Sequence, residues 1–123
     1  MQDIVDVFEG KGGLLSIELD KDFILGIKNA KAALPAAYTS PLAGWIAGGH
    51  SIAIHADTGG QSSSTVMSIK ASIDTQLVAL KALLGVTKIA GISGVCSHAD
   101  WVQAITDLGF TYTTSVVEYC LKS

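Results

Sequence analysis

Four apolar runs that alternate with helical patterns constrain this 123-residue chain more than any other feature. The runs cover residues 12–20, 50–57, 86–94 and 110–119, and isoleucine, valine and threonine are frequent in them. Such residues favour strands, and strands with few polar positions are typical of parallel sheets that are covered on both faces. The sequence therefore predicts an α/β fold of four strand–helix units with a mainly parallel sheet.

The clearest helix lies between the second and third runs. From residue 62 to residue 85, apolar side chains recur every three or four positions, which marks one buried face of a helix. The serines at 62–64 are candidate N-caps, and Gly85 is a candidate C-terminal stop. Shorter helices are expected within residues 21–34, 40–49 and 97–109.

Composition limits the class of protein. Hydrophobic residues make up 49% of the chain, which is enough for one core, so we expect a single domain over residues 1–123. The formal charge is −3 and no basic run occurs, which argues against a nucleic-acid partner. No apolar stretch approaches the roughly 18 residues of a membrane span, and no signal peptide is visible, so a cytoplasmic location is expected. Cys96 and Cys120 favour reduced thiols over a disulfide framework, and whether they pair stays open.

Polar side chains follow the carboxyl ends of all four predicted strands. In sheets built from strand–helix units, ligands bind at this edge because the loops that leave it converge there. The sequence therefore predicts a polar site at one edge of the sheet. Its candidate residues are Glu18, Asp20, His55, Asp57, Ser93, Cys96 and Glu118.

The spacing within the first two strands favours a cation site but does not require one. Glu18 and Asp20 are two residues apart, as are His55 and Asp57, so each pair projects to one side of a regular strand. An imidazole among carboxylates suits a divalent cation. Strand ends also carry polar residues simply because the chain meets solvent there, and clustered ionisable groups are often structural. His50 lies roughly 16 Å from His55 along a strand, so we expect a separate, hydrogen-bonding role for it.

The order of these motifs resembles the NodB-homology polysaccharide deacetylases, metal-dependent carbohydrate esterases on a distorted (β/α) barrel. The stretch SIELD is similar to the family's first motif, in which two acids close the first strand. The stretch GHSIAIH is similar to its second motif, a Gly-His pair followed five residues later by a metal-binding histidine. The likeness runs from Gly13 to Tyr119 and implies that the chain forms part of such a barrel.

The chain also departs from the family pattern. The family's second metal-binding histidine comes four residues after the first, where this chain has Gly59, and Asp57 is the nearby substitute. The third motif normally carries an arginine and prolines, which GISGVCS lacks. No later strands follow the fourth, so the family's remaining catalytic histidine and its acetate pocket have no counterpart in this sequence.

The resemblance implies metal-dependent hydrolysis of N- or O-acetyl groups on carbohydrate. A divalent metal, expected to be zinc, would be held by Asp20, His55 and Asp57, with Glu18 as catalytic base. Ser93, Cys96 and Glu118 are the expected contacts to an acetylated carbohydrate. The alternative is a catalytically inactive fragment or degenerate homologue that acts as a binding or assembly module.

The predicted sheet has too few strands to close a barrel. Open sheet edges favour aggregation unless they are covered. Two copies of the chain would supply eight strands, so we expect a homodimer. The N-terminal residues 1–10 and the C-terminal tail are the other candidates for covering the edges.

Overall fold

The computed structural model describes residues 1–29, 41–59, 65–96 and 101–113, with only the backbone at 57–59 and 96. Four strands form one parallel sheet, in which neighbours in space are also neighbours in the chain. The predicted α/β fold with a parallel sheet is therefore confirmed. The strands are β1 (Ser16–Asp20), β2 (Ser51–Gly59), β3 (Gly91–Cys96) and β4 (Tyr112–Thr113).

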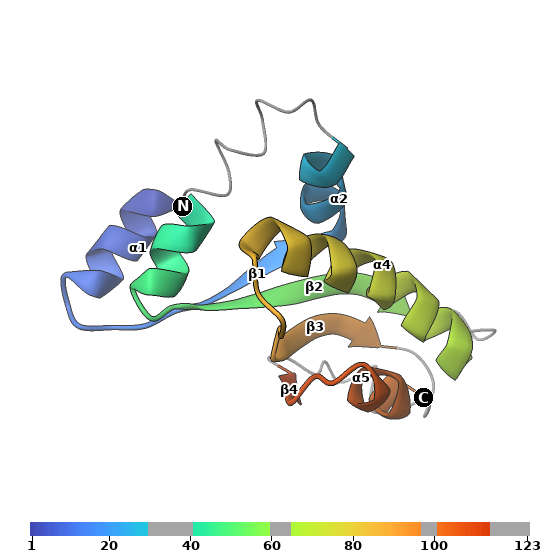
Figure 1. Ribbon diagram of the computed structural model, residues 1–123. Helices are drawn as coiled ribbons and strands as arrows, with labels where there is room; N and C mark the ends of the chain where they lie inside the picture. Colours follow the sequence, from blue (N-terminus) through green and yellow to red (C-terminus); the bar gives the residue numbers. More distant parts are fainter. Residues whose placement is uncertain (30–40, 60–64, 97–100, 114–123) are drawn as a thin grey trace.

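Helices join the strands and extend the fold at its N-terminal end. They are α1 (Gln2–Glu9), α2 (Lys21–Asn29), a helix over residues 41–47, α4 (Val66–Leu84) and α5 (Trp101–Asp107). In Figure 1, α4 runs along the sheet, while α1 and the 41–47 helix lie together beyond the ends at which β1 and β2 begin. The short helix expected after Pro41 is thus present.

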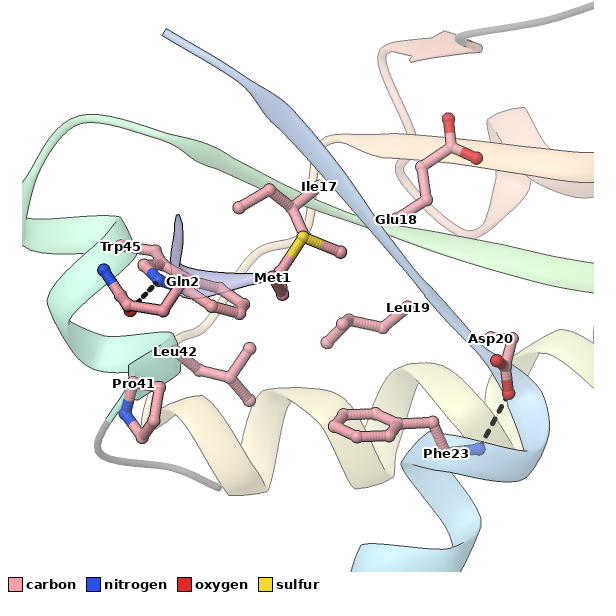
Figure 2. Close-up of a pocket in the computed structure, with 10 residues that line it drawn as sticks. All are labelled: Met1, Gln2, Ile17, Glu18, Leu19, Asp20, Phe23, Pro41, Leu42 and Trp45. Carbon is pink, nitrogen blue, oxygen red and sulfur yellow. Dashed lines mark hydrogen bonds between the residues drawn. The ribbon is translucent and has the colours of Figure 1, made fainter. Parts of the chain in front are cut away.

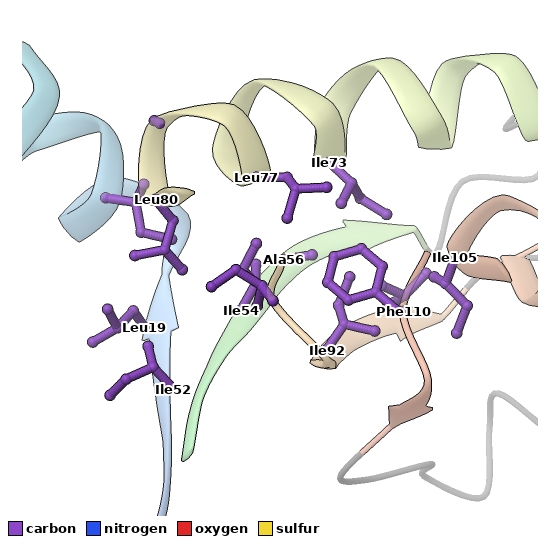
Figure 3. Packing of buried hydrophobic residues seen from close by; sticks show 14 of the residues in the cluster. Leu19, Ile52, Ile54, Ala56, Ile73, Leu77, Leu80, Ile92, Ile105 and Phe110 are labelled. Carbon is purple, nitrogen blue, oxygen red and sulfur yellow. The ribbon is translucent and has the colours of Figure 1, made fainter. Parts of the chain in front are cut away.

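The core lies between one face of the sheet and the helices α2, α4 and α5. Figure 3 shows Ile73 and Leu77 of α4 directed at Ile54 of β2 and Ile92 of β3, and these side chains belong to one buried cluster. Ile73, Ile54 and Ile92 have no exposed surface. The apolar stripe that the sequence predicts for α4 is therefore the stripe that covers the sheet.

The opposite face of the sheet carries small and polar side chains. Along β1, buried and exposed residues alternate, with Ile17 and Leu19 towards the helices and Glu18 away from them. Each new strand is added at the same edge of the sheet. When the connections between such strands are all right-handed, the connecting helices lie on the same side of the sheet. Among the described residues, α2, α4 and α5 pack on the face of Ile17 and Leu19, and the covering of the second face stays a prediction.

The ends of α4 are fixed by local hydrogen bonds. Thr65 is the N-cap: its Oγ1 accepts from the backbone N–H of Ser68 at 3.2 Å, and Ser68 Oγ accepts from the N–H of Thr65 at 2.9 Å. This reciprocal pair satisfies two N–H groups of the first turn. The cap predicted at residues 62–64 is therefore wrong. Gly85 ends the helix with φ 64°, as expected.

Helix α1 is the element that sequence patterns did not reveal. It buries only Val5, while Ile4, Val7 and Phe8 are exposed. Its C-terminal end is tied to the sheet through His50, whose side chain is fully buried. His50 Nδ1 accepts from the backbone N–H of Leu15 at 3.0 Å, and Nε2 lies 3.0 Å from Glu9 Oε1. The hydrogen-bonding role expected for His50 is thus present, and it joins α1 to the start of β2.

Replacing His50 by alanine should lower the free energy of unfolding by about 3 kcal/mol. The variant loses a hydrogen bond to a carboxylate and leaves the Leu15 N–H without its acceptor. Urea unfolding followed by circular dichroism measures the effect. His55→Ala is the matched control, because the His55 side chain is 44% exposed and its removal should cost less. Equal losses in the two variants would contradict this role for His50.

Candidate functional site

Three consecutive strands bring polar side chains together, at the end of β1 and in the middle of β2 and β3. Asp20, His55 and Ser93 are in register across β1, β2 and β3. Glu18 lies two residues before Asp20, on the same side of β1. Residues in register on parallel strands project to the same face, so these four side chains share the face opposite the helices. Four residues that the sequence predicts for one site are therefore neighbours.

Ser93 is the centre of this cluster. Its Oγ donates to Glu18 Oε2 at 2.5 Å and lies 2.9 Å from His55 Nδ1. The direct separation between His55 Nδ1 and Glu18 Oε2 is longer, at 3.5 Å. Ser93 has no exposed surface, whereas the side chains of Glu18 and His55 are 29% and 44% exposed. The hydroxyl therefore lies beneath two groups that both reach solvent.

This geometry limits the chemistry of the cluster. A serine nucleophile needs an accessible oxygen and a base that accepts its proton. Ser93 is buried and already directs its proton to Glu18, so it is not presented for attack on a ligand. The groups that a ligand would meet are the carboxylate of Glu18 and the imidazole of His55. Both are proton acceptors and hydrogen-bonding groups.

Asp20 has a structural partner that the sequence analysis did not anticipate. Its Oδ1 accepts from the backbone N–H of Phe23 at 2.8 Å, where α2 begins. A carboxylate in this position satisfies one of the free N–H groups of the helix and interacts favourably with its dipole. Figure 2 shows this contact as a dashed line. One oxygen of the predicted metal ligand is therefore used to start a helix.

The described side chains do not assemble a complete metal site. Among them, no group of three or more histidine, cysteine, aspartate or glutamate side chains is arranged to hold a metal ion. Asp20 and His55 are adjacent, but the third predicted ligand, Asp57, is described only by its backbone. The zinc site stays a prediction, and we derive no chemical step through a metal.

A β-bulge follows His55 directly. Between the pairs His55–Ser93 and Thr58–Val95, β2 has two residues where β3 has only Gly94. Gly94 adopts φ 65°, a conformation that favours glycine. The regular alternation that predicted a common side for His55 and Asp57 is interrupted here.

The helix above supports this bulge. Gln76 of α4 is fully buried, and its Nε2 donates to the carbonyl oxygen of Ala56 at 3.1 Å. The carbonyl lies where the β2–β3 ladder is irregular, so a side-chain amide supplies a hydrogen bond there. Gln76 therefore stabilises the backbone next to the cluster.

Two further predicted ligand contacts cannot be placed beside the cluster. Cys96 ends β3 in register with Gly59, and only its backbone is described. Glu118 lies outside the described residues, as does Cys120, the possible partner of Cys96. Their roles stay predictions.

Tyr112 extends the polar face beyond the predicted residues. It lies on β4, is 40% exposed, and its OH is 2.7 Å from Ser51 Oγ on β2. The ring crosses Gly91 of β3: a Cβ at Gly91 would lie 2.5 Å from Tyr112 Cζ. A side chain at residue 91 would therefore displace the Tyr112 ring from this position. The unusual glycine at the start of a buried strand was the one signal in the sequence for this contact.

A separate pocket of about 560 Å³ lies on the helix side of β1. Figure 2 shows Ile17 and Leu19 at this pocket, with the Glu18 carboxylate directed to the other side of β1. Trp45 is 9% exposed and donates through Nε1 to Gln2 Oε1 at 2.9 Å, so its indole is part of the core and not an exposed platform for sugars. Periodicity did not reveal the pocket because α1, α2 and the 41–47 helix form it jointly. Its lining residues are Met1, Gln2, Ile17, Glu18, Leu19, Asp20, Phe23, Pro41, Leu42 and Trp45.

Comparison of the chain with protein-family models, with curated proteins and with solved structures gives no match. In the described part of the chain, no helix is both long enough and apolar enough to cross a membrane.

Proposed function

We propose that the chain is a polysaccharide deacetylase-like protein that hydrolyses acetyl groups on a carbohydrate. The observation that carries the proposal is the hydrogen-bonded cluster of Glu18, Ser93 and His55, drawn from three consecutive parallel strands. It lies at the middle of the strands, on the face without described helices. Strand–helix barrels bind their ligands at the carboxyl ends of the strands, and Asp20, which pairs with His55, is the last residue of β1.

The topology of the sheet supports the same proposal. Strands in chain order with helices on one face are the arrangement of a (β/α) barrel, whereas a doubly wound sheet reverses its strand order and carries helices on both faces. The polar face of this sheet corresponds to the inside of such a barrel. The resemblance to the deacetylases, which rests on SIELD and GHSIAIH, therefore agrees with the topology.

In the proposed reaction, Glu18 is the general base. Its carboxylate takes a proton from a water molecule while the water oxygen bonds to the acetyl carbon. The bond from that carbon to the sugar nitrogen or oxygen then breaks, and the proton passes to the leaving atom. The products are acetate and the free amine or hydroxyl. Zinc at Asp20, His55 and Asp57 is a separate prediction, on which no step of this description depends.

The variant Glu18→Gln should lower the rate of acetate release from acetylated oligosaccharides about 10²- to 10⁴-fold, because the amide cannot accept the proton. Acetate released by the purified chain is the measurement. Asp74→Asn, at an exposed position of α4, is the matched control and should leave the rate unchanged. A Glu18→Gln variant as active as the starting protein would rule out this base, and a starting protein without activity would rule out the hydrolysis.

A second candidate function is a non-catalytic binding or assembly module, in which two copies of the chain associate. Helix α1 favours it, because Ile4, Val7 and Phe8 lie on one side of the helix and are 53%, 64% and 43% exposed. An exposed apolar patch of this kind often marks a protein interface. We define Ile4, Val7 and Phe8 as the α1 patch and propose that a second copy covers it, which agrees with the expected homodimer.

The variant Val7→Glu should convert the dimer into a monomer, since a charge in the interface would have to be desolvated. Light scattering over a range of protein concentrations gives the mass in solution. Val78→Glu is the matched control: Val78 is 57% exposed on α4, away from the α1 patch, and its change should leave the dimer intact. A starting protein that is monomeric throughout, or equal dissociation by both variants, would contradict the interface.

The remaining expectations accompany this proposal as predictions. The cytoplasmic location stays a prediction made from the sequence. An acetylated carbohydrate remains the proposed ligand. Nucleic acid remains an unlikely partner on charge grounds, because the chain carries a formal charge of −3.

A further inference from the structure

The hydrogen bonds around Ser93 determine where the protons of the cluster lie. A serine hydroxyl has one proton, and an ionised carboxylate can only accept hydrogen bonds. Ser93 Oγ donates that proton to Glu18 Oε2 at 2.5 Å. The contact of 2.9 Å between His55 Nδ1 and Ser93 Oγ is then a hydrogen bond only if Nδ1 donates. The three groups therefore form a chain of hydrogen bonds with one direction, from His55 through Ser93 to Glu18.

We propose that Ser93 is a positioning residue that holds neutral His55 in the tautomer with its proton on Nδ1. The other ring nitrogen, Nε2, then carries a lone pair. Within the described residues Nε2 has no hydrogen-bond partner, and the His55 side chain is 44% exposed on the polar face. Nε2 is therefore a fixed acceptor for a ligand group that donates a hydrogen bond, such as a sugar hydroxyl or an amide N–H. The proposal depends on these contacts alone and not on hydrolysis.

The hydroxyl is required because Glu18 does not reach the ring directly. Glu18 Oε2 and His55 Nδ1 are 3.5 Å apart, which is beyond normal hydrogen-bond length. Ser93 Oγ lies between them and has no access to solvent. The hydrogen-bonded link between Glu18 and the imidazole therefore runs through Ser93.

His50 provides a reference within the same molecule, because its contacts fix the opposite tautomer. Its Nδ1 accepts from the backbone N–H of Leu15, so Nε2 carries the proton and donates to Glu9 Oε1. His50 is buried at the other end of β2 and is not available to a ligand. His50, which directly precedes β2, and His55 within β2 should therefore give two different tautomers under the same conditions.

The test is a two-bond ¹H–¹⁵N correlation spectrum of the full chain labelled at histidine. It is recorded about two pH units above the ordinary histidine pKa of about 6.5, so that neutral rings predominate. The ring signals of His55 are identified by their loss in His55→Gln. The expected result is an Nδ1–H pattern for His55 beside an Nε2–H pattern for His50.

Variants test whether Ser93 is the cause. Ser93→Ala should shift His55 to the Nε2–H form that free histidine prefers, and Ser93→Thr, which keeps the hydroxyl, should retain the Nδ1–H form. Ser51→Ala, which removes a hydroxyl from the same face of the sheet, is the control and should leave His55 unchanged.

Each outcome bears directly on the proposal. An Nε2–H pattern for His55 in the starting protein would overturn it, as would an Nδ1–H pattern that persists in Ser93→Ala. Unchanged His50 signals show that a variant is folded. If Ser93→Thr fails to fold, the comparison of the starting protein with Ser93→Ala tests the proposal. An Nδ1–H pattern in a chain that releases no acetate would support this inference while ending the proposal of hydrolysis.

Discussion

The parallel pairing of β1, β2, β3 and β4 in chain order is the constraint on which the other features depend. Because each crossover advances in the same direction, α2, α4 and α5 gather on one side and bury the isoleucines of the sheet there. The other side keeps polar and small residues. The same register places Glu18, His55 and Ser93 side by side on adjacent strands. The core and the candidate site therefore lie on opposite faces of the same sheet.

The polar face is built around a neutral hydroxyl between two ionisable groups. Burial of a charge is costly, and burial of a hydroxyl is tolerated when its hydrogen bonds are made. Ser93 meets this condition, because it contacts Glu18 on one side and His55 on the other. The ionisable groups themselves stay partly in solvent. The cluster can therefore be rigid at its base and accessible at its surface.

Much of the fold and part of the site could be predicted from the sequence. Apolar runs located the four strands, helical periodicity located α4, and the rule for strand ends brought Glu18, Asp20, His55 and Ser93 to one face. The β2 bulge could not be predicted, because it depends on pairing with Gly94 in another strand. Likewise, the capping role of Asp20 and the contact between Tyr112 and Ser51 depend on positions in space that periodicity does not encode. Metal, carbohydrate and dimer are chemical predictions that need measurement.

The Tyr112 side chain has a mechanical consequence for the edge of the sheet. It leaves β4, passes over the bare backbone of Gly91 in β3, and ends at Ser51 in β2. In the described part of the chain, β4 has two residues, which pair with Gly91 and Ile92 of β3. A force that pulls β4 away from the sheet would act on two strands. The backbone of β4 is bonded to β3, and the Tyr112 hydroxyl is hydrogen-bonded to Ser51 in β2. Within the described residues, β4 is thereby linked to β2 as well as to β3, the strand with which its backbone pairs.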